Sequence, residues 1–541
     1  MELLMNTAKG FVVFNNIKLP ISASIQEALS VAKKRAVRLG ISGEAKSYTV
    51  YKRSIDARRK DNILFVYSIA ARGDYKLPDA AALSSVDASV QSDGSLPDIA
   101  FGDERLSSPP VVVGTGPAGL FAALLLAEYG YKPVVLERGG SVAERQEAYR
   151  KFTKERILSE DTNIQFGAGG AGTFSDGKLV TRIGDPLSSY VLSRLTELGA
   201  PREILYTARP HIGTDILASV VDAAIGEIER LGGRVLFNTK YLSHKERVGR
   251  VSSVMTSRGE IECGALILAV GHSARDTYKM LIEGGTDIIA KDFSVGMRIE
   301  HLRSDIDSAM YGSEAGNPVL GAAEYNLSHN TKTRGVYTFC MCPGGEVVAA
   351  ASEQLGVVVN GMSESRRSGR NSNCAVVCSV FKSDYGNTAE AAIDFQRTIE
   401  RRAYIAGGSD YSAPIITVGD FLSGELRREP KRITPTYMDG SVRLCRPEEY
   451  LPPFVCENIK GALASFDKKI SGFAQEGALL TGAETRTSAP VRILRDRVTL
   501  LATGYQNLYP AGEGAGYAGG ITSAAIDGLR TAIALMSKYR A

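Results

Sequence analysis

The chain has 541 residues, of which 44% are hydrophobic and 23% are charged, and its formal net charge is +4. This ordinary composition excludes a disordered or fibrous chain, and the small net charge does not by itself indicate a nucleic-acid or membrane partner. The length predicts two to four domains with a large buried core.

The seven cysteines are odd in number and sparse for this length. Their number favours free thiols in a reducing compartment over a disulfide framework. Residues Met1–Met5 lack the basic segment and long apolar run of a signal peptide, and the apolar run 120–127 is too short to span a bilayer. We therefore expect a cytoplasmic protein without a membrane partner.

Residues 1–76 are predicted to form a small basic α/β module. A helix with an apolar stripe is predicted over 24–39 and ends at Gly40. Three apolar or β-branched segments are predicted strands: residues 11–14, 48–51 and 63–69. The module contains 14 Lys and Arg against 6 Asp and Glu, which gives it a net charge of +8.

Residues 77–108 are rich in Ala, Ser, Asp, Gly and Pro and show no period, so they are predicted to be a linker. Strand and helix then alternate over 109–289, where residues 235–237 and 251–256 are predicted to be strands of a meander. Residues 290–485 have strands and a helix of their own and are predicted to form an inserted substrate domain. Segment 486–541 then completes the domain that begins at 109. The predicted fold class is α/β: a Rossmann-type domain, an inserted α+β domain and a small N-terminal module.

A glycine-rich turn follows the buried strand predicted at 111–113 and opens a helix predicted at 117–129. The second predicted strand, 133–137, ends in Glu137, which Arg138 follows. The turn has the pattern G-x-G-x-x-G and consists of Gly114, Thr115, Gly116, Pro117, Ala118 and Gly119. In this context the pattern indicates a dinucleotide-binding βαβ unit, rather than a chance glycine-rich turn.

Each of the three glycines of the pattern has a physical role. Gly114 permits the tight turn, Gly116 lets the backbone approach a pyrophosphate, and Gly119 lets helix and strand pack closely. The helix N-terminus offers free N–H groups and a positive dipole end to the phosphates. Glu137 is expected to accept hydrogen bonds from both ribose hydroxyls, which disfavours a 2′-phosphate.

The C-terminal segment favours FAD over NAD. An apolar strand at 508–510 runs into a turn that contains Gly512 and Glu513, and a helix of small residues begins near Gly520 and Ile521. This resembles the second flavin-binding motif of flavoproteins with two dinucleotide-binding domains, where an acidic residue binds the ribityl and phosphate region. The helix N-terminus would face the flavin N1–C2 region and stabilise the reduced flavin. Taken alone, an ordinary strand–turn–helix corner is the alternative.

Two further glycine segments are predicted to line the cofactor. The apolar strand 265–270 ends at Gly271 and resembles the strand ending in Ala-Thr-Gly of the same superfamily. The loop 167–172 repeats the glycine pattern, but it neither follows a buried strand nor opens an amphipathic helix, so no second nucleotide fold is expected. Its Gly170 and Gly172 are expected to approach the isoalloxazine or the pyrophosphate, as in fumarate-reductase-like flavoproteins.

Six further segments, spread along the chain, can be compared with known families. They are residues 52–60, 166–179 (FGAGGAGTFSDGKL), 210–215, 293–301, 340–345 and 359–363. Together they resemble the uncharacterised FAD-dependent dehydrogenase family of bacteria and plastids, over nearly the whole chain. The resemblance implies FAD binding in a glutathione-reductase-like or fumarate-reductase-like fold and does not define a substrate.

The catalytic residue is not identified by the sequence. His211, His272 and His301 are candidate proton donors, although a histidine near a cofactor more often orders a loop. Arg298 and Arg366 are candidates for binding a substrate carboxylate, with structural ion pairs as the alternative.

Cys340 and Cys342 are candidates for a redox dithiol or for half of a metal site, with Cys374 and Cys378 as the other half. The C-x-C spacing is atypical for zinc and no histidine lies nearby in the sequence, so no metal is expected. Ordinary buried thiols are the alternative to a dithiol.

Taken together, the motifs predict an FAD-dependent oxidoreductase that transfers a hydride through flavin N5 to or from a small molecule. Only one Rossmann unit is convincing, so NAD(P)H would bind transiently in the substrate cleft, or electrons would come from another partner. Two alternatives are a flavoprotein of tRNA or RNA modification and a non-redox FAD-binding scaffold. No RNA-binding signature is present, so no nucleic-acid partner is expected. The oligomeric state is not predicted.

Overall fold

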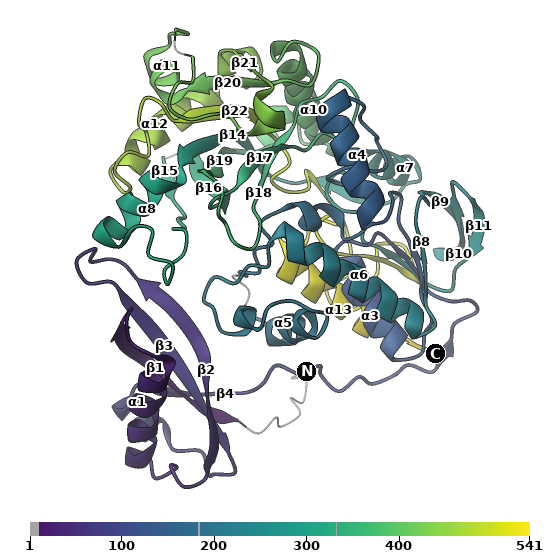
Figure 1. Ribbon diagram of the computed structural model, residues 1–541. Coiled ribbons are helices and arrows are strands. Elements are labelled where there is room, and N and C mark those ends of the chain that lie inside the picture. Colours follow the sequence, from purple (N-terminus) through teal and green to yellow (C-terminus); the bar gives the residue numbers. More distant parts are fainter. Residues whose placement is uncertain (1–9, 182–183, 332, 428) are drawn as a thin grey trace.

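The computed structural model of the chain describes residues 10–541 except 182–183, 332 and 428. Met1–Met5, on which the expected lack of a signal peptide depends, lie outside the described residues. The chain forms a Rossmann-type domain, an inserted domain above it in the view of Figure 1, and an N-terminal module below and to one side.

The Rossmann-type domain is built on a five-stranded parallel sheet with the order β24-β12-β6-β7-β8. The strands are β6 (Val111–Val113), β7 (Val134–Leu136), β8 (Arg234–Leu236), β12 (Leu266–Leu268) and β24 (Leu508–Pro510). The two halves of the domain are far apart in sequence, yet β24 pairs directly with β12. The chain therefore returns to this sheet near its C-terminal end.

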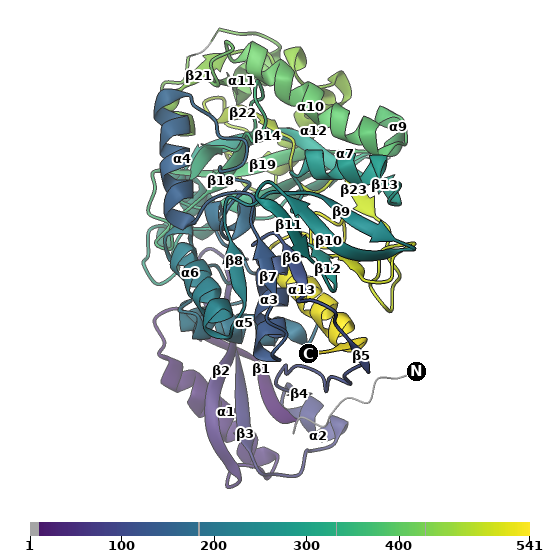
Figure 2. The same ribbon diagram turned by 90° about the vertical axis from the view of Figure 1, so that its right-hand side faces the viewer.

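Alternate residues of these strands face two different layers, because successive side chains of a strand point to opposite faces. Val112, Val135 and Ile267 pack into the core formed by helices. The helices are α3 (Pro117–Glu128), α5 (Leu187–Glu197), α6 (Thr214–Arg230) and α13 (Ile521–Met536). Val111, Val113 and their neighbours pack instead against an antiparallel meander on the other side of the sheet (Figure 2).

The meander consists of β9 (Tyr241–Arg247), β10 (Arg250–Thr256) and β11 (Gly259–Glu262). We expect residues 235–237 to belong to this meander, and that expectation is wrong. Arg234–Leu236 forms the edge strand β8 of the parallel sheet, where it pairs with β7. A short apolar segment is compatible with a strand of either sheet, so the pattern alone does not distinguish the two positions.

The inserted domain is built on a seven-stranded sheet with the order β15-β16-β19-β14-β22-β20-β21. The strands are β14 (Phe293–Leu302), β15 (Ser328–Asn330), β16 (Gly335–Cys342), β19 (Asn371–Val380), β20 (Ala413–Thr417), β21 (Val442–Leu444) and β22 (Leu479–Glu484). Helices α10 (Ala389–Ala406) and α12 (Pro453–Asp467) and the hairpin β17 (Glu346–Ala349) with β18 (Val359–Met362) surround it (Figure 1).

The two faces of this sheet differ in polarity. Met297 and Ile299 of β14 pack into the apolar core that also contains residues of α12. Arg298 and Glu300 alternate with them and are also fully buried, on the polar face. The chain enters the domain through β13 (Ile288–Ala290) and leaves it through β23 (Val491–Ile493), which pair with each other. The segment between these two strands therefore lies between two parts of the chain that pair with each other.

The N-terminal module is a four-stranded antiparallel sheet with the order β2-β3-β1-β4. Its elements are β1 (Phe11–Pro20), α1 (Ile25–Arg38), β2 (Ala45–Asp56), β3 (Leu64–Gly73), α2 (Ala80–Ser85) and β4 (Ala88–Gln91). Part of the predicted linker 77–108 therefore belongs to the module, because α2 and β4 lie within it. Their short lengths leave too few residues for a visible sequence period.

The module contacts both other parts of the protein. At the edge strand β2, the Arg53 N–H donates to Tyr206 O at 2.7 Å, and the Ala208 N–H donates to Arg53 O at 2.9 Å. The loop between β2 and β3 places Ile63 in the apolar core of the inserted domain, with Tyr311 of α8 (Arg303–Tyr311) in the same core. The module thus bridges the Rossmann-type and inserted domains.

Candidate cofactor site and domain boundary

The structure requires glycine at two of the three glycine positions of the first turn, and not at the third. A Cβ on Gly114, whose φ is 100°, would lie 2.3 Å from Ala269 O, and a Cβ on Gly119 would lie 1.9 Å from Gly114 O. The fold itself therefore requires glycine at both positions. Gly116 has an ordinary φ of −65°, and a Cβ there would meet no protein atom within 4 Å. The space beside Gly116 is open, as a bound pyrophosphate requires.

The predicted loops converge on this turn although they are far apart in the sequence. A Cβ on Gly170 would lie 3.0 Å from the Cα of Gly116, and one on Gly172 would lie 3.4 Å from Ile521 and 3.8 Å from Pro117. The loop at 167–172 continues as a short 3₁₀ helix, Gly170–Phe174, and not as a second βα unit, as expected.

The C-terminal turn packs against the same region. A Cβ on Gly512 would lie 2.6 Å from that of Ala118, and one on Gly514 would lie 2.6 Å from the backbone of Gly271. Gly116 and Gly520 are the N-cap residues of helices α3 and α13, and neither has a capping side chain. The first N–H groups of both helices are therefore open to an anion or a carbonyl oxygen.

The role predicted for Glu137 differs from the one that the structure gives it. One carboxylate oxygen accepts from the N–H and Oγ1 of Thr115 at 3.0 and 2.6 Å. The other accepts from the N–H groups of Gly139 and Gly167 at 3.0 and 2.9 Å. These four donors occupy the lone-pair positions of the Glu137 carboxylate, so no lone pair is free to accept from ribose hydroxyls. Glu137 instead fixes the first turn to the loop at Gly167.

Arg138 is likewise engaged within the protein. Its guanidinium pairs with Asp161 and Asp276 at 2.7 and 2.8 Å, and it lies over the ring of Phe166 at 4.1 Å. The neighbouring guanidinium lowers the pKa of Asp276 to about 2, against the opposing effect of burial. This cluster anchors the start of α7 (Arg275–Glu283) to the end of β7.

Glu513 is the titratable group of the C-terminal turn. Burial raises the pKa of its carboxyl to about 7, while the Lys291 ammonium and a hydrogen bond from the Gly520 N–H lower it. Burial in turn lowers the pKa of Lys291, and Glu513 raises it. A carboxyl that changes charge near neutral pH therefore lies at the N-terminus of α13.

Two predicted catalytic candidates are wrong because they have no access to a substrate. His301 is fully buried, its Nε2 donates to Phe473 O at 2.7 Å, and burial lowers its pKa to about 4. Arg298 is also fully buried. Its five N–H groups are all used: two donate to Glu484, one to the carbonyl of Cys340, one to Asn373 and one to Asn360.

The other candidates lie at the boundary between the domains. His272 follows Gly271 and lies 2.9 Å from Ser273 Oγ through its Nδ1, and burial lowers its pKa to about 3. His211 lies 3.2 Å from Ser365 O, and burial lowers its pKa as well. Both imidazoles are neutral at pH 7. Arg366 is exposed.

An ion-pair network that the sequence does not reveal joins the two domains. Arg275 of α7 pairs with Glu400 of α10 at 2.7 Å and with Glu353 at 2.8 Å, and Arg486 pairs with Glu400 at 3.1 Å. A second tie joins Asp176, beyond the loop at 170–174, to Arg367 of the inserted domain, with Nε and Oδ1 2.9 Å apart. The paired residues are between 78 and 191 positions apart, so no local motif marks them.

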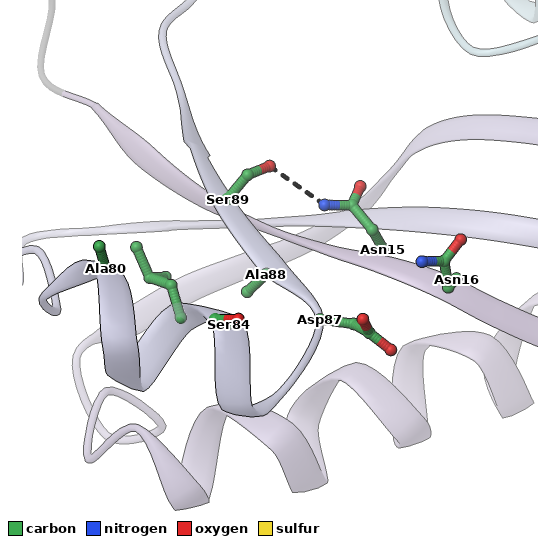
Figure 3. Close-up of a pocket in the computed structure, with 8 residues that line it drawn as sticks. Asn15, Asn16, Ala80, Ser84, Asp87, Ala88 and Ser89 are labelled. Atoms are coloured by element: carbon green, nitrogen blue, oxygen red, sulfur yellow. Dashed lines mark hydrogen bonds between the residues drawn. The ribbon is translucent and has the colours of Figure 1, made fainter.

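A surface pocket lies on the N-terminal module, between α2, β4 and β1 (Figure 3). It is lined by Asn15, Asn16, Ala80, Leu83, Ser84, Asp87, Ala88 and Ser89. The Asn15 side-chain amide donates to Ser89 Oγ at 3.1 Å. The pocket lies apart from the glycine-rich loops, and its small polar side chains include one carboxyl, that of Asp87. It therefore does not belong to the candidate site.

Within the described part of the chain, no helix is both long and apolar enough to cross a membrane. Over the same residues, His, Cys, Asp and Glu side chains form no group of three or more that could hold a metal ion.

Comparison with known proteins adds family information to this geometry. A family model described as an FAD binding domain matches residues 108–149, and one described as the C-terminal domain of FAD-dependent proteins matches residues 292–487. A domain of unknown function matches residues 13–72. An uncharacterised protein of Clostridium beijerinckii is 44% identical over 530 residues, which cover 97% of this chain and 98% of that protein.

Solved structures give weaker similarities. The L-amino acid deaminase of Proteus vulgaris is 12% identical, covers 82% of this chain and 97% of its own, and has a TM-score of 0.33. The glycine oxidase of Bacillus cereus is 10% identical, covers 80% and 98%, and has a TM-score of 0.32. CtdE, solved with FAD, is 12% identical, covers 79% and 84%, and has a TM-score of 0.32. Similarities at this level carry no function to this chain.

Proposed function

We propose an oxidoreductase function for this chain, which belongs to the family of FAD-dependent proteins that includes the Clostridium beijerinckii relative and contains an FAD-binding domain. The proposal covers the use of FAD in a two-electron reaction on a small molecule. The substrate and the direction of the reaction lie beyond what the motifs define.

The open space at Gly116 carries the proposal. The protein imposes no steric demand for glycine there, whereas Gly114 and Gly119 are both required by backbone contacts. A glycine that the fold does not need, at the N-terminus of α3, is explained by a ligand that approaches the backbone. The loops at Gly170 and Ile521 adjoin the same turn, so they would hold the remainder of the cofactor.

When bound, FAD supplies hydride chemistry at its N5 atom, and the protein supplies binding, orientation and electrostatics. The N-terminus of α13 would place N–H groups and a positive dipole end beside the flavin. Glu513 would hold or release a proton there, because its pKa lies near 7. The neutral His272, at the end of β12, and the neutral His211 are the remaining imidazole candidates for a proton transfer on the substrate side.

The first test of the proposal is the absorption spectrum of the purified protein, followed by acid release and identification of the pigment. A flavin spectrum, with FAD in the supernatant at about one per chain, is the expected result. A colourless protein that takes up no FAD but binds NAD would refute the cofactor assignment for the C-terminal turn.

Anaerobic mixing with NADH and NADPH tests the source of electrons. Bleaching of the flavin by one of them would identify the donor, and no bleaching by either would remove direct reduction by a nicotinamide. The RNA-modification alternative predicts a shift of tRNA on a native gel, and the scaffold alternative predicts a flavin that dithionite reduces but no substrate reoxidises.

A further inference from the structure

Cys340 differs from the other cysteines in its surroundings. All seven cysteines lie within the described residues; Cys340 is exposed and the other six are buried. Arg298 of the inserted domain and Lys178 of the Rossmann-type domain both donate to the backbone here, at Cys340 O and Met341 O. Cys340 therefore lies where the two domains meet.

The backbone at Cys340 is distorted from the geometry of a regular strand. Its φ is 44°, in the left-handed region that residues other than glycine rarely adopt. The pairing of β16 with β19 shifts between Phe339 and Cys342, so residues 340–341 form a bulge. Such strain persists only where the surroundings hold it, and it gathers at functional sites.

Two contacts from different domains hold this bulge. The Arg298 guanidinium donates to Cys340 O at 3.0 Å, and the Lys178 ammonium donates to Met341 O. Lys178 ends the segment whose Gly170 adjoins Gly116 of the first dinucleotide turn. A single stretch of nine residues therefore runs from the cofactor turn to the backbone next to Cys340.

Cys342 contacts the backbone of Cys340. Its Sγ donates to Cys340 O at 3.3 Å, and its side chain is buried. A flat strand would separate Cα atoms two residues apart by about 6.6 Å, close to the upper limit for a disulfide of about 6.8 Å. The left-handed Cys340 and the bulge depart from that flat geometry. Cys374 does not compete, because its side chain packs on the apolar face of the sheet and accepts from Tyr325 Oη at 3.1 Å.

We propose that Cys340 and Cys342 form a redox-active thiol pair that passes electrons from the flavin to a disulfide substrate at the exposed Cys340. The proposal rests on the flavin function above and names the substrate class for it. In the oxidised pair, one Sγ–Sγ bond replaces two S–H bonds. A hydride from the reduced flavin and one proton break this bond and restore both thiols. The pair then exchanges with an external disulfide, reforms its own bond and releases two substrate thiols.

Counting thiols tests the pair without any activity measurement. Denatured wild-type protein should show all seven thiols after reduction and five after mild oxidation with diamide, because one pair of the seven cysteines is lost. The Cys340→Ser variant should show six thiols in both states. Cys378→Ser is the matched control, because this residue is buried in the neighbouring strand β19. It should lose two thiols on oxidation, as the wild type does.

An anaerobic dithionite titration then tests the coupling to the flavin. Oxidised wild-type protein and the Cys378→Ser control should take up four electrons per FAD, two for the flavin and two for the disulfide, whereas Cys340→Ser should take up two. Seven thiols after oxidation, with two electrons taken up per FAD, would overturn the pair and leave the flavin function standing. Five thiols in a protein that binds no FAD would overturn the flavin function instead, and with it the coupling.

Discussion

Substitution of Gly116 separates the binding of FAD from the folding of the chain. In Gly116→Val, the new side chain meets no protein atom at its Cβ and the backbone keeps an ordinary φ. The expected loss of stability without FAD is about 1 kcal/mol or less, from the weaker N-cap of α3. The side chain fills the space that a pyrophosphate would occupy, so FAD binding should be lost.

The magnitude follows from linkage. Free FAD at 100 times its Kd stabilises a binding protein by about 2.7 kcal/mol, and a variant that cannot bind gains nothing. Gly119→Ala should behave differently, because its Cβ would lie 1.9 Å from Gly114 O. Overpacking of this kind costs roughly 1–3 kcal/mol with or without FAD.

Thermal unfolding of the apoprotein, measured with and without added FAD, distinguishes these outcomes. Gly226→Ala is the control: it lies on the exposed side of α6, its Cβ meets no atom within 4 Å, and it should gain about 0.5–1 kcal/mol. The control should keep the full response to FAD. A Gly116→Val protein with the same FAD-dependent stabilisation as wild type would refute the reasoning.

Three further predictions concern other parts of the molecule. The pKa of Glu513 is raised from 4.5 to about 7 in the folded protein, so its contribution to stability is present below pH 4.5 and lost as pH rises through 7. The Glu513→Gln variant should not show this loss, and equal pH profiles of the thermal midpoint for the two apoproteins would contradict the prediction. Arg298→Met leaves Glu484 buried without its partner and should lower the free energy of unfolding by about 3–5 kcal/mol. In urea unfolding, the double variant with Glu484→Gln should recover part of the lost free energy, and no recovery would argue against the pairing. Ile63→Ala should loosen the N-terminal module, so limited proteolysis should release it faster than from wild type; unchanged cleavage would show that its burial in the inserted domain does not hold the module.

The sequence predicts the parts of the fold that depend on neighbouring residues. The turn at Gly114 is recognised because strand, glycines and helix follow one another, and the return of the chain at Leu508 is recognised from a second strand and glycine-rich turn. Strand β8 is misplaced because three apolar residues fit either a parallel sheet or a meander. Strand β4 is missed because its four residues show no period.

The polar side chains of the site were harder to predict, because their roles depend on distant partners. Arg298 and Glu484 are 186 positions apart, and their pairing turns a candidate substrate ligand into a buried structural group. Glu137 ends the predicted strand as expected, but its carboxylate is filled by donors from two loops, one of them 30 residues away. Residue type identified these groups, whereas only the fold shows which of them are already satisfied.

The strand order of the Rossmann-type sheet has a consequence for biosynthesis. Strand β12 lies between β6 and β24, and β24 and helix α13 belong to the last residues of the chain. About 400 residues separate β6 from β24, so a ribosome adding roughly 5–20 residues per second needs roughly 20–80 s to pass from one to the other. The inserted domain is complete before that sheet can close. Once β12 has emerged, the chain therefore presents an unfinished sheet edge at this strand until β24 follows, and the cofactor site is incomplete until β24 and α13 have been made.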